Sequence, residues 1–407
     1  MMKLHVKDLK VEGKKVLVRV DFNVPHNDDG TIRDDTRVVA ALPTIKELVK
    51  KGAKVILMSH LGKIKFKKGP EAVEKAKAAN NMAPVADCLA KHLGQKVAFV
   101  DATRGEKLVA AVDALNNGDV LLMQNTRYEE GETKNDPDLA AIWAGLADAF
   151  VMDAFGSAHR AHASTYGVPE ILNKEGKPTA IGYLMEKEIV NLARCVTVEE
   201  KDRPYIAILG GLKVSDKIKV IESLLKKCDR IIIGGAMAYT FFKARGFETG
   251  TSPVEDDQVD YAKKCLESGK IVLPVDNVVA DEFKDAKVVK TVDCDNLPVD
   301  MMGMDIGPKT RKLFAEEIAK ANTIFWNGPA GVFEQERFQT GTIAICQAIA
   351  DNDHCFSVVG GGDSAAAVNQ LGFKSKFSHI STGGGASLQI IENDGHLPGV
   401  DIISEAK

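Results

Sequence analysis

The strongest constraint on the fold is the alternation of short apolar runs with longer segments of helical periodicity along almost the whole chain. The runs cover residues 16–20, 54–59, 97–100, 120–124 and 149–153, and then 205–209, 230–234, 271–275, 323–327, 356–360 and 378–382. They lack regular polar alternation, which is typical of parallel strands covered by helices on both faces. Segments 36–51, 83–93, 215–227 and 255–268 fit the intervening helices. The sequence therefore predicts a doubly wound α/β architecture.

The residues that follow the strands differ between the two halves of the chain. In the first half they are polar and basic, as in DFN (21–23), SHLGK (59–63), QNTR (124–127) and DAFGSAHR (153–160). In the second half they are rich in glycine, as in GGLK (210–213), WNGPAG (326–331), GGGDS (360–364) and STGGG (381–385). Ligands of such sheets bind beyond the carboxyl ends of the strands. Glycine lets backbone amides approach a phosphate closely, and a following helix N-terminus adds a favourable dipole.

Two different ligand surfaces predict two doubly wound parallel-sheet (Rossmann-like) domains. We place their boundary between 170 and 203, where the helix-like GYLMEKEIVNLARCV follows ILNKEGKPTA. The expected N-terminal domain covers 1–180, a linker helix that serves as a hinge covers 181–197, and the C-terminal domain covers 198–394.

Composition narrows the class of protein. The chain of 407 residues is long enough for two or three domains, and its net charge of −4 argues against a protein that coats nucleic acid or an anionic membrane. Its seven cysteines include no Cys-x-x-Cys pair, which argues against a disulfide framework and a zinc module. MMKLHVKDLK at the N-terminus is too charged for a signal peptide, and the apolar LAAIWAGLADAFVM is too short to span a membrane. A soluble cytoplasmic protein is expected.

Several residues in the second half suit a nucleotide. GGGDSA (360–365) fits the G-x-G-x-x-A dinucleotide fingerprint, but Ser381 and Thr382 stand near the position of the acidic residue that would bind a ribose. This favours a mononucleotide phosphate over NAD, and no P-loop motif occurs. Lys213 follows a glycine-tight turn before a helix, which suits a phosphate ligand. Glu334 fits a ligand contact and an ordinary surface position equally well.

The decapeptide FGSAHRAHAS (155–164) places His159 and His162 three residues apart, a spacing that can serve a metal. Arg160 between them would repel a cation and attract an anion. We therefore expect a basic pocket around Arg160 that faces a carboxylate or a phosphate, with both histidines as supporting neighbours. The basic run KIKFKK (63–68) is interpreted as a solvated loop.

Taken together, these motifs resemble those of the phosphoglycerate kinase family. The matching stretches are RVDFNVP (19–25), DDTRVVAALPTI (34–45), MSHLG (58–62), NTR (125–127), DAFGSAHRAHAS (153–164), KVSDKI (213–218), WNGPAGVFE (326–334), GGGDSAAAV (360–368) and STGGGASL (381–388). They follow the family's order over essentially the whole chain.

The resemblance implies a two-domain glycolytic kinase that converts 1,3-bisphosphoglycerate and Mg-ADP to 3-phosphoglycerate and Mg-ATP. The implied phosphoglycerate-binding residues are Asp21, Phe22, Asn23, Arg37, His60, Leu61, Gly62, Lys63, Arg127 and Arg160. The implied nucleotide-binding residues are Lys213, Gly303, Glu334, Gly361, Gly362, Asp363 and Ser364, with Glu334 on the ribose and Asp363 on Mg²⁺. Arg37 and Lys213 would stabilise the transferred phosphoryl group. The resemblance also implies a monomer whose tail, residues 395–407, packs onto the first domain.

Some positions depart from the family pattern. Lys63 and Ile64 replace an Arg-Pro pair, and lysine offers a point charge rather than a bidentate fork. Leu212 and Ala236 replace smaller residues beside the expected adenine site. The sequence also has two alternative functional interpretations. A nicotinamide-dependent oxidoreductase lacks its ribose-binding acid, and a non-catalytic nucleotide-binding protein would not need both halves of the site.

Overall fold

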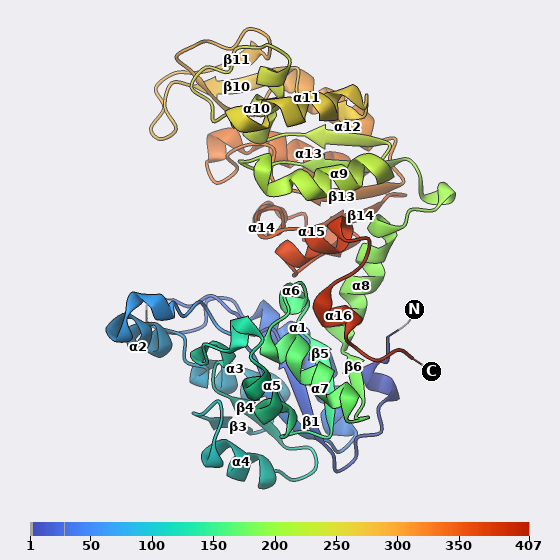
Figure 1. Ribbon diagram of the computed structural model, residues 1–407. Helices are drawn as coiled ribbons and strands as arrows, with labels where there is room; N and C mark the ends of the chain where they lie inside the picture. The colour runs from blue at the N-terminus through green and yellow to red at the C-terminus, as the bar shows by residue number, and fades with distance from the viewer. Residues whose placement is uncertain (1–2, 28, 407) are drawn as a thin grey trace. The chain divides into compact units, whose positions relative to one another are not determined.

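The computed structural model describes residues 3–27 and 29–406, and the chain divides into two compact units. One unit contains the chain up to Ile189 together with the segment from His396 onward, and the other is Val190–Gly395. Figure 1 labels the elements of both. Among the described residues, no helix combines the length and the apolar character needed to cross a membrane.

The N-terminal unit is built on a six-stranded sheet in the order β3-β4-β2-β1-β5-β6, in which all the neighbouring pairs are parallel. Its strands are β1 (Lys15–Val20), β2 (Lys54–Met58), β3 (Val97–Val100), β4 (Val120–Met123), β5 (Ala149–Asp153) and β6 (Thr179–Ile181). Its helices are α1 (Thr36–Lys50), α2 (Pro70–Ala79), α3 (Ala83–Leu93), α4 (Glu106–Asp113), α5 (Pro137–Ala144), α6 (Phe155–Ala158), α7 (Val168–Lys174) and α16 (Pro398–Asp401).

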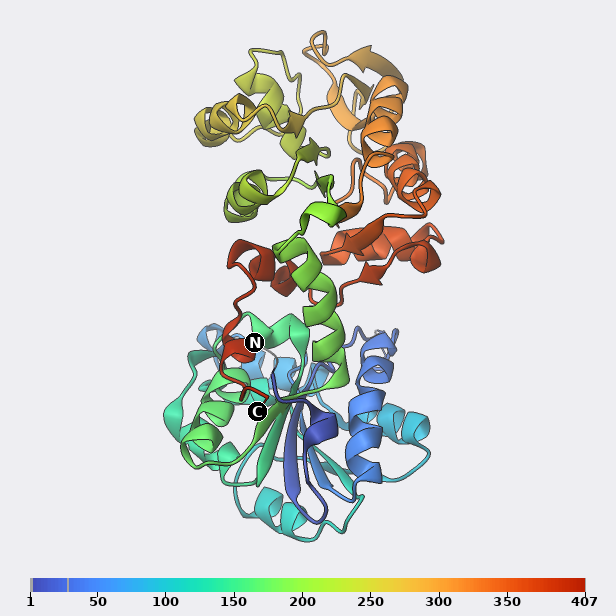
Figure 2. The same cartoon turned by 90° about the vertical axis from the view of Figure 1, so that its right-hand side faces the viewer.

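Helices cover both faces of this sheet, as the apolar strands require. α1 packs with α3 on one face and α5 packs with α7 on the other (Figure 2). The central strands β1, β2, β4 and β5 are almost entirely buried, including both faces of β5. Burial of such strands supplies most of the favourable free energy of folding, at about 25 cal/mol per Å² of apolar surface.

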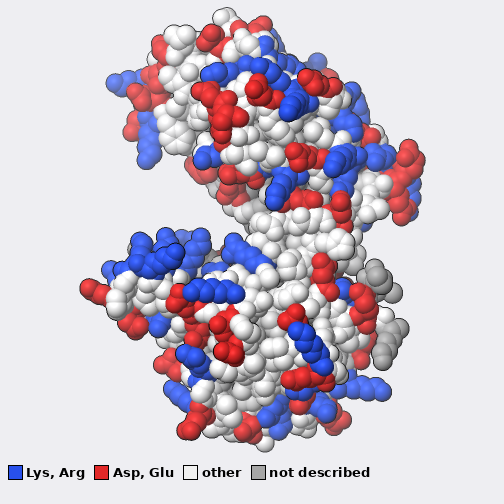
Figure 3. Space-filling view, viewed as in Figure 1, with Lys and Arg blue, Asp and Glu red and all other residues white. Residues whose placement is uncertain are grey.

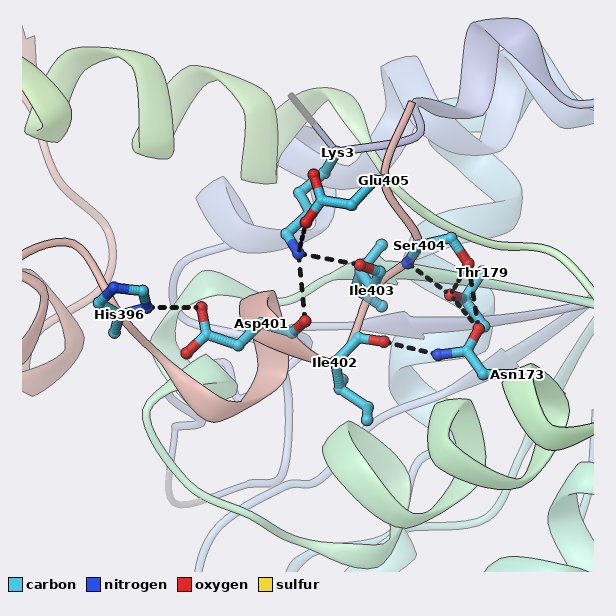
Figure 4. Close-up of polar contacts among 9 residues, drawn as sticks. All are labelled: Lys3, Asn173, Thr179, His396, Asp401, Ile402, Ile403, Ser404 and Glu405. Atoms are coloured by element: carbon cyan, nitrogen blue, oxygen red, sulfur yellow. Dashed lines mark hydrogen bonds and ion pairs between the residues drawn. The ribbon is translucent and has the colours of Figure 1, made fainter. Parts of the chain in front are cut away.

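The segment after residue 395 packs on the N-terminal unit (Figure 4). Asn173 Nδ2 donates to the carbonyl of Ile402 at 2.6 Å, and Ser404 N donates to Thr179 Oγ1 at 3.0 Å. The ammonium of Lys3 donates to two carbonyl oxygens of this segment, at 3.0 and 3.1 Å. Side chains near residue 175 and the very start of the chain therefore hold the C-terminal segment by its backbone.

The C-terminal unit contains a second parallel six-stranded sheet, in the order β15-β14-β13-β7-β8-β9. Its strands are β7 (Tyr205–Leu209), β8 (Arg230–Ile233), β9 (Ile271–Val272), β13 (Thr323–Asn327), β14 (Phe356–Val359) and β15 (His379–Ile380). Its helices are α9 (Ile218–Lys227), α10 (Met237–Ala244), α11 (Val259–Glu267), α12 (Pro308–Ile318), α13 (Thr340–Asp351), α14 (Gly362–Gln370) and α15 (Gly385–Glu392). The predicted class, α/β with two doubly wound parallel sheets, is confirmed.

A three-stranded antiparallel sheet in this unit was not predicted. It consists of β10 (Asp276–Ala280), β11 (Val289–Asp293) and β12 (Met302–Ile306) in the order β11-β10-β12. The edge strand β11 reads VKTVD and is largely exposed, so it lacks the apolar run by which the other strands were recognised. The three-residue strand β6 was missed because it is too short to form such a run.

Helix α8 (Tyr183–Val196) contains the point at which the chain passes from one unit to the other. A fully buried carboxylate, Asp153 at the end of β5, caps it. Asp153 Oδ1 accepts hydrogen bonds from the backbone N–H of Leu184 at 3.0 Å and of Met185 at 3.2 Å. Burial raises the pKa of Asp153 to about 7, although these hydrogen bonds and one from Thr44 act in the opposite direction. The desolvation of the charge therefore outweighs the helix cap.

We predict that Asp153 makes the N-terminal unit less stable as the pH rises from about 4 to 7. Its pKa is near 3.9 in an unfolded chain and about 7 in the fold. Between these two pKa values the folded state therefore keeps a proton that the unfolded state has lost, which stabilises the fold. This stabilisation is gone once the pH passes 7. The loss is on the order of 4 kcal/mol. Urea denaturation at pH 5 and pH 7.5 measures the part of this loss that falls between those pH values, roughly 3 kcal/mol.

The neutral variant Asp153→Asn keeps an oxygen for the helix cap and should show a flatter dependence of stability on pH. The exposed Asp138 provides the matched control, since Asp138→Asn should leave the dependence unchanged. Equal pH dependence in wild type and Asp153→Asn would contradict the assignment.

Candidate functional site

The first group of predicted site residues lies at one edge of the N-terminal sheet. Strands β4, β2, β1 and β5 are consecutive neighbours and run parallel. Their carboxyl ends therefore meet at the same edge, and the segments 21–23, 59–63, 124–127 and 154–160 follow them there. Parallel pairing thus brings together residues that are more than a hundred positions apart.

Hydrogen bonds and an ion pair connect several of these residues directly. The guanidinium of Arg37, on the first turn of α1, contacts the carboxylate of Asp21. Asn23 Oδ1 accepts from the backbone N–H of Gly62 at 2.8 Å, and Arg127 donates to the carbonyl of the same glycine. Side chains from α1 and from the loops after β1 and β4 are therefore connected to one another and to the backbone of the loop after β2.

A buried arginine makes hydrogen bonds to residues at this edge of the sheet. Arg19, within β1, is 1% exposed and donates to His60 Nδ1 at 3.0 Å and to Ser164 Oγ at 2.8 Å. Ser164 in turn donates through its backbone N–H and its hydroxyl to the fully buried Glu132, at 2.9 and 2.5 Å. Sequence reasoning missed Arg19 and Glu132. The available signal was Arg19 itself, a charged residue inside the apolar run VLVRV. A buried charge needs partners, so this residue indicated a polar network in the core.

The electrostatic field at this edge keeps its histidines neutral. Burial, followed by the charges of Arg19 and Arg127, holds the pKa of His60 well below its usual value. The same causes lower the pKa of His162 to about 4. Burial also lowers the pKa of Arg127, to about 10, which still leaves it charged at neutral pH. The positive charge of the site therefore resides on guanidinium groups, while the imidazoles act as neutral hydrogen-bonding groups.

The metal interpretation of His159 and His162 gains no support. Burial and the neighbouring Arg160 lower the pKa of His159 to about 4. Within residues 3–27 and 29–406, neither histidine belongs to a group of side chains close enough to hold an ion. Arg160 itself is exposed. The anion interpretation is the one consistent with this charge distribution.

The side chains of two expected substrate-binding residues are buried. Phe22 is fully buried and Leu61 is 2% exposed. The backbone N–H of Phe22 bonds Ser59 Oγ at 2.9 Å, and both backbone polar groups of Leu61 bond the side chain of Asn125. These two residues position the loops, and any contact that they make with a ligand would come from their backbone rather than their buried side chains.

Lys63 is exposed and begins a basic segment. The segment continues through η2 (Phe66–Lys68) to α2, where Figure 3 shows lysine and arginine side chains gathered on the surface of the N-terminal unit. The exposure of Lys65, Lys67 and Lys68 agrees with the interpretation of a solvated loop.

The second group of site residues surrounds a cavity of about 320 Å³ in the C-terminal unit. It lies beyond the carboxyl ends of β7, β13, β14 and β15, at the N-termini of α14 and α15. Of the predicted residues, Lys213, Gly361, Gly362, Asp363 and Ser364 line it. The other lining residues include Gly210, Gly211, Leu212, Asp216, Lys217, Asn327, Gly328, Gly384, Gly385 and Leu388.

Close packing of the backbone shapes the wall of this cavity. Gly361 has φ +92°, and a Cβ at this position would lie 2.4 Å from Asn327 Nδ2. Asn327 Nδ2 donates to the carbonyl of Gly360 at 2.8 Å, while Ser364 Oγ accepts from the N–H of Gly328 at 2.5 Å. The loops after β13 and β14 are therefore tied together, and the residues that open α14 line the cavity, where free amide groups favour a phosphate.

Lys217 and Asn327 are site residues that sequence reasoning did not select. The ammonium of Lys217 contacts Asn327 Oδ1. Burial lowers the pKa of Lys217, with Asp216 and Asp363 opposing the shift. Lys217 follows Lys213 by four residues, and Asn327 ends the strand TIFWN. These spacings were the available signals.

Two expected nucleotide ligands do not line this cavity. Gly303 lies in β12, where a Cβ would meet the hydroxyl of Tyr239 at 1.4 Å, so packing alone requires a glycine there. Glu334 is exposed on the loop that follows β13. Ala236, next to the expected adenine site, precedes α10 and also lies outside the lining, whereas Leu212 is 58% exposed and belongs to it.

The fold and this glycine-rich cavity define a phosphate-binding α/β protein with two doubly wound domains. The family model for phosphoglycerate kinase matches residues 6–394. The phosphoglycerate kinase of Enterococcus faecalis is 51% identical over 411 residues and covers both chains completely. That of Fusobacterium nucleatum is 52% identical over 99% of this chain and 100% of the relative. The solved structure of phosphoglycerate kinase from Coxiella burnetii has a TM-score of 0.85 at 38% identity, with 98% of each chain covered.

The chain therefore belongs to the phosphoglycerate kinase family, as the motifs indicated. It is an enzyme of this type, a glycolytic phosphotransferase, and the family implies phosphoglycerate and ADP or ATP as substrates. Neither the nicotinamide-dependent oxidoreductase nor the non-catalytic nucleotide-binding protein finds support in these relatives.

We predict that Gly361→Ala weakens ATP binding by about tenfold or more, equivalent to roughly 1.4 kcal/mol. The added methyl group would displace Asn327 and the amides that open α14, because only 2.4 Å is available. Gly372→Ala is the matched control, since it has a comparable φ of +79° but no atom within 4 Å of the added group. Isothermal titration with ATP measures both. Equal affinities in the two variants would show that the steric argument is wrong.

Proposed function

We propose that the enzyme transfers the acyl phosphate of 1,3-bisphosphoglycerate to Mg-ADP, giving 3-phosphoglycerate and Mg-ATP, and that it also catalyses the reverse reaction. The observation that best supports this reaction is the glycine-lined cavity with two lysines, in a chain whose other unit presents a guanidinium-rich sheet edge. The glycine-lined cavity suits the phosphates of a nucleotide, and the guanidinium-rich sheet edge suits a small polyanion.

Phosphoglycerate binds at the edge of the N-terminal sheet in this proposal. Asp21 and Asn23 contact its hydroxyl and carboxyl end, and Arg37, Arg127 and Arg160 bind its negative charges. Their guanidinium groups suit phosphate and carboxylate oxygens geometrically. His60 contributes as a neutral hydrogen-bonding group, because its pKa lies well below the physiological range. Gly62 and Lys63 border the ligand, and Lys63 provides a single point charge.

The nucleotide binds in the C-terminal unit. Lys213 contacts its phosphates, and the amide groups of Gly361 and Gly362 donate to them at the start of α14. The hydroxyl of Ser364 closes the same wall. The assignments of Gly303 to the nucleotide neighbourhood and of Glu334 to the ribose rest on the family resemblance alone.

Mg²⁺ accompanies the nucleotide, and the residues present fit it. Asp363 is an exposed carboxylate that lines the cavity beside the amides of α14. Mg²⁺ in phosphate sites commonly uses one or two carboxylates together with phosphate oxygens and water. When bound, the ion offsets the negative charge of the phosphates. Asp363 is the residue that would hold it.

The chemistry needs alignment and charge rather than a general base. The attacking oxygen of ADP is already anionic, so in-line transfer depends on positioning and on stabilising the equatorial oxygens of the phosphoryl group. Arg37 and Lys213 supply this charge. They belong to different units, so the reaction requires closure about a hinge at α8, which also excludes water that would hydrolyse the acyl phosphate.

The enzyme works in this proposal as a cytoplasmic monomer that binds neither nucleic acid nor membranes. The net charge of −4 supports the last point, since it provides no general attraction to polyanions.

We predict that Arg37→Ala and Lys213→Ala each lower kcat by at least two to three orders of magnitude. This corresponds to a rise of roughly 3–5 kcal/mol in the activation free energy, as expected for the loss of a group that stabilises charge in the transition state. A coupled assay with 3-phosphoglycerate and Mg-ATP measures the rates. Lys219→Ala is the control, because Lys219 is an exposed lysine on α9 outside the cavity lining and should retain normal turnover. Near-normal turnover of Arg37→Ala and Lys213→Ala would refute the assignment, and an inactive wild type would refute the reaction itself.

A further inference from the structure

A second cavity, of about 1000 Å³, lies in the N-terminal unit between the loop before α1 and the helix α3. Residues 31–35 form one side, and Asp87, Cys88, Lys91 and His92 of α3 line another. The proposed phosphoglycerate-binding residues do not line it. The reaction discussed above therefore gives this cavity no role.

Three side chains of different chemistry converge in this cavity. The ligand atoms of Asp35, Cys88 and His92 all lie within 4.8 Å of one another. His92 Nε2 is 2.8 Å from Asp35 Oδ2. A metal site made by protein side chains usually brings together at least three ligands from His, Cys, Asp or Glu. In the described parts of the chain, these three residues are the group with that spacing.

The secondary structure explains the convergence. Cys88 and His92 are four residues apart on α3, so both side chains project from the same face of the helix. Asp35 is the N-cap residue of α1, yet its side chain makes no hydrogen bond to the helix that it precedes. Aspartate at this position usually bonds the free N–H groups of the first turn. Here its carboxylate instead extends across to α3.

We infer that Asp35, Cys88 and His92 form a binding site for Zn²⁺ or a comparable thiophilic divalent cation. Thiolate, imidazole and carboxylate are the ligand types that zinc prefers, and three protein ligands leave a fourth position for water. At zinc–ligand distances of about 2.0–2.3 Å, tetrahedral ligand atoms stand roughly 3.3–3.6 Å apart. The present spacing, up to 4.8 Å, reaches this range with adjustments of about an ångström, which side-chain rotation provides.

The surrounding charges favour a cation. Arg33 and Lys91 also line the cavity, but Asp34, Asp35 and Asp87 outnumber them. Zinc binding displaces the thiol proton of Cys88 to solvent, so affinity rises with pH. The Asp35 carboxylate is 48% exposed and the His92 ring 33% exposed, which gives an ion access from solvent.

The test uses the reduced, full-length protein with the metal alone and without nucleotide, so that no phosphate recruits an ion elsewhere. Co²⁺ replaces Zn²⁺ as a spectroscopic probe, and titration should give one thiolate-to-cobalt charge-transfer band that Zn²⁺ abolishes. In Cys88→Ser this band should disappear. In His92→Gln and Asp35→Asn the dissociation constant for Zn²⁺, measured against a chromophoric chelator, should rise about tenfold or more.

Cys355→Ser is the matched control, since Cys355 is the other half-buried free thiol. It should keep both the band and the affinity. Zn²⁺ should also slow the alkylation of Cys88 but leave that of Cys355 unchanged. Circular dichroism confirms that each variant is folded. The inference is overturned if wild type gives no thiolate band, or if wild type and Cys88→Ser bind Zn²⁺ equally well. The experiment does not measure kinase activity. The result of the metal-binding test is therefore independent of the proposed reaction.

Discussion

The parallel pairing of the central strands is the constraint on which both binding surfaces depend. In the N-terminal unit β1 pairs with β2 and β5, and in the C-terminal unit β13 pairs with β7 and β14. Each pairing places loops that are distant in sequence at the same edge of a sheet. A shift of one residue in a single strand would exchange the side chains packed on its two faces and also move the loop that follows it. The apolar character of the strands therefore fixes the position of the polar residues that bind ligands.

The two units solve the problem of binding anions in different ways. The N-terminal unit relies on side-chain charge, and it keeps Arg19 buried beneath the surface at the cost of the partners that this charge requires. Because burial, and after it the charge of Arg19, lowers the pKa of His60 and His162, the edge holds its positive charge on guanidinium groups at physiological pH. The charge of these histidines should therefore vary little with pH in this range.

The C-terminal unit relies on its backbone. Gly361 can stand against Asn327 only because it has no side chain, and the contact joins the loops after β13 and β14. The amide groups at the start of α14 are then left to face the cavity. Lys213 and Lys217 add charge at its rim, Lys213 exposed and Lys217 half-buried. Such a surface suits a phosphate chain, whose charge is spread over several oxygens.

The sequence alone determined the α/β class, most strand positions and the two kinds of ligand surface. Unbroken apolar runs identify buried parallel strands, and the residue types after them reveal the chemistry of the edge. It missed β11, whose exposed and partly charged residues carry no apolar signal. Phe22 and Leu61 sit within recognised motifs, and only the structure shows that their side chains are buried.

Only the tertiary structure decided which residues meet. The pairing of Arg19 with His60 and Ser164, the contact of Lys217 with Asn327, and the convergence of Asp35 with Cys88 and His92 all join segments far apart in the chain. Cysteine spacing had argued against a zinc module, because such patterns register only ligands that are close in sequence. Local patterns report how each segment folds. Contacts between segments depend on strand order and helix packing, which the folded chain alone brings about.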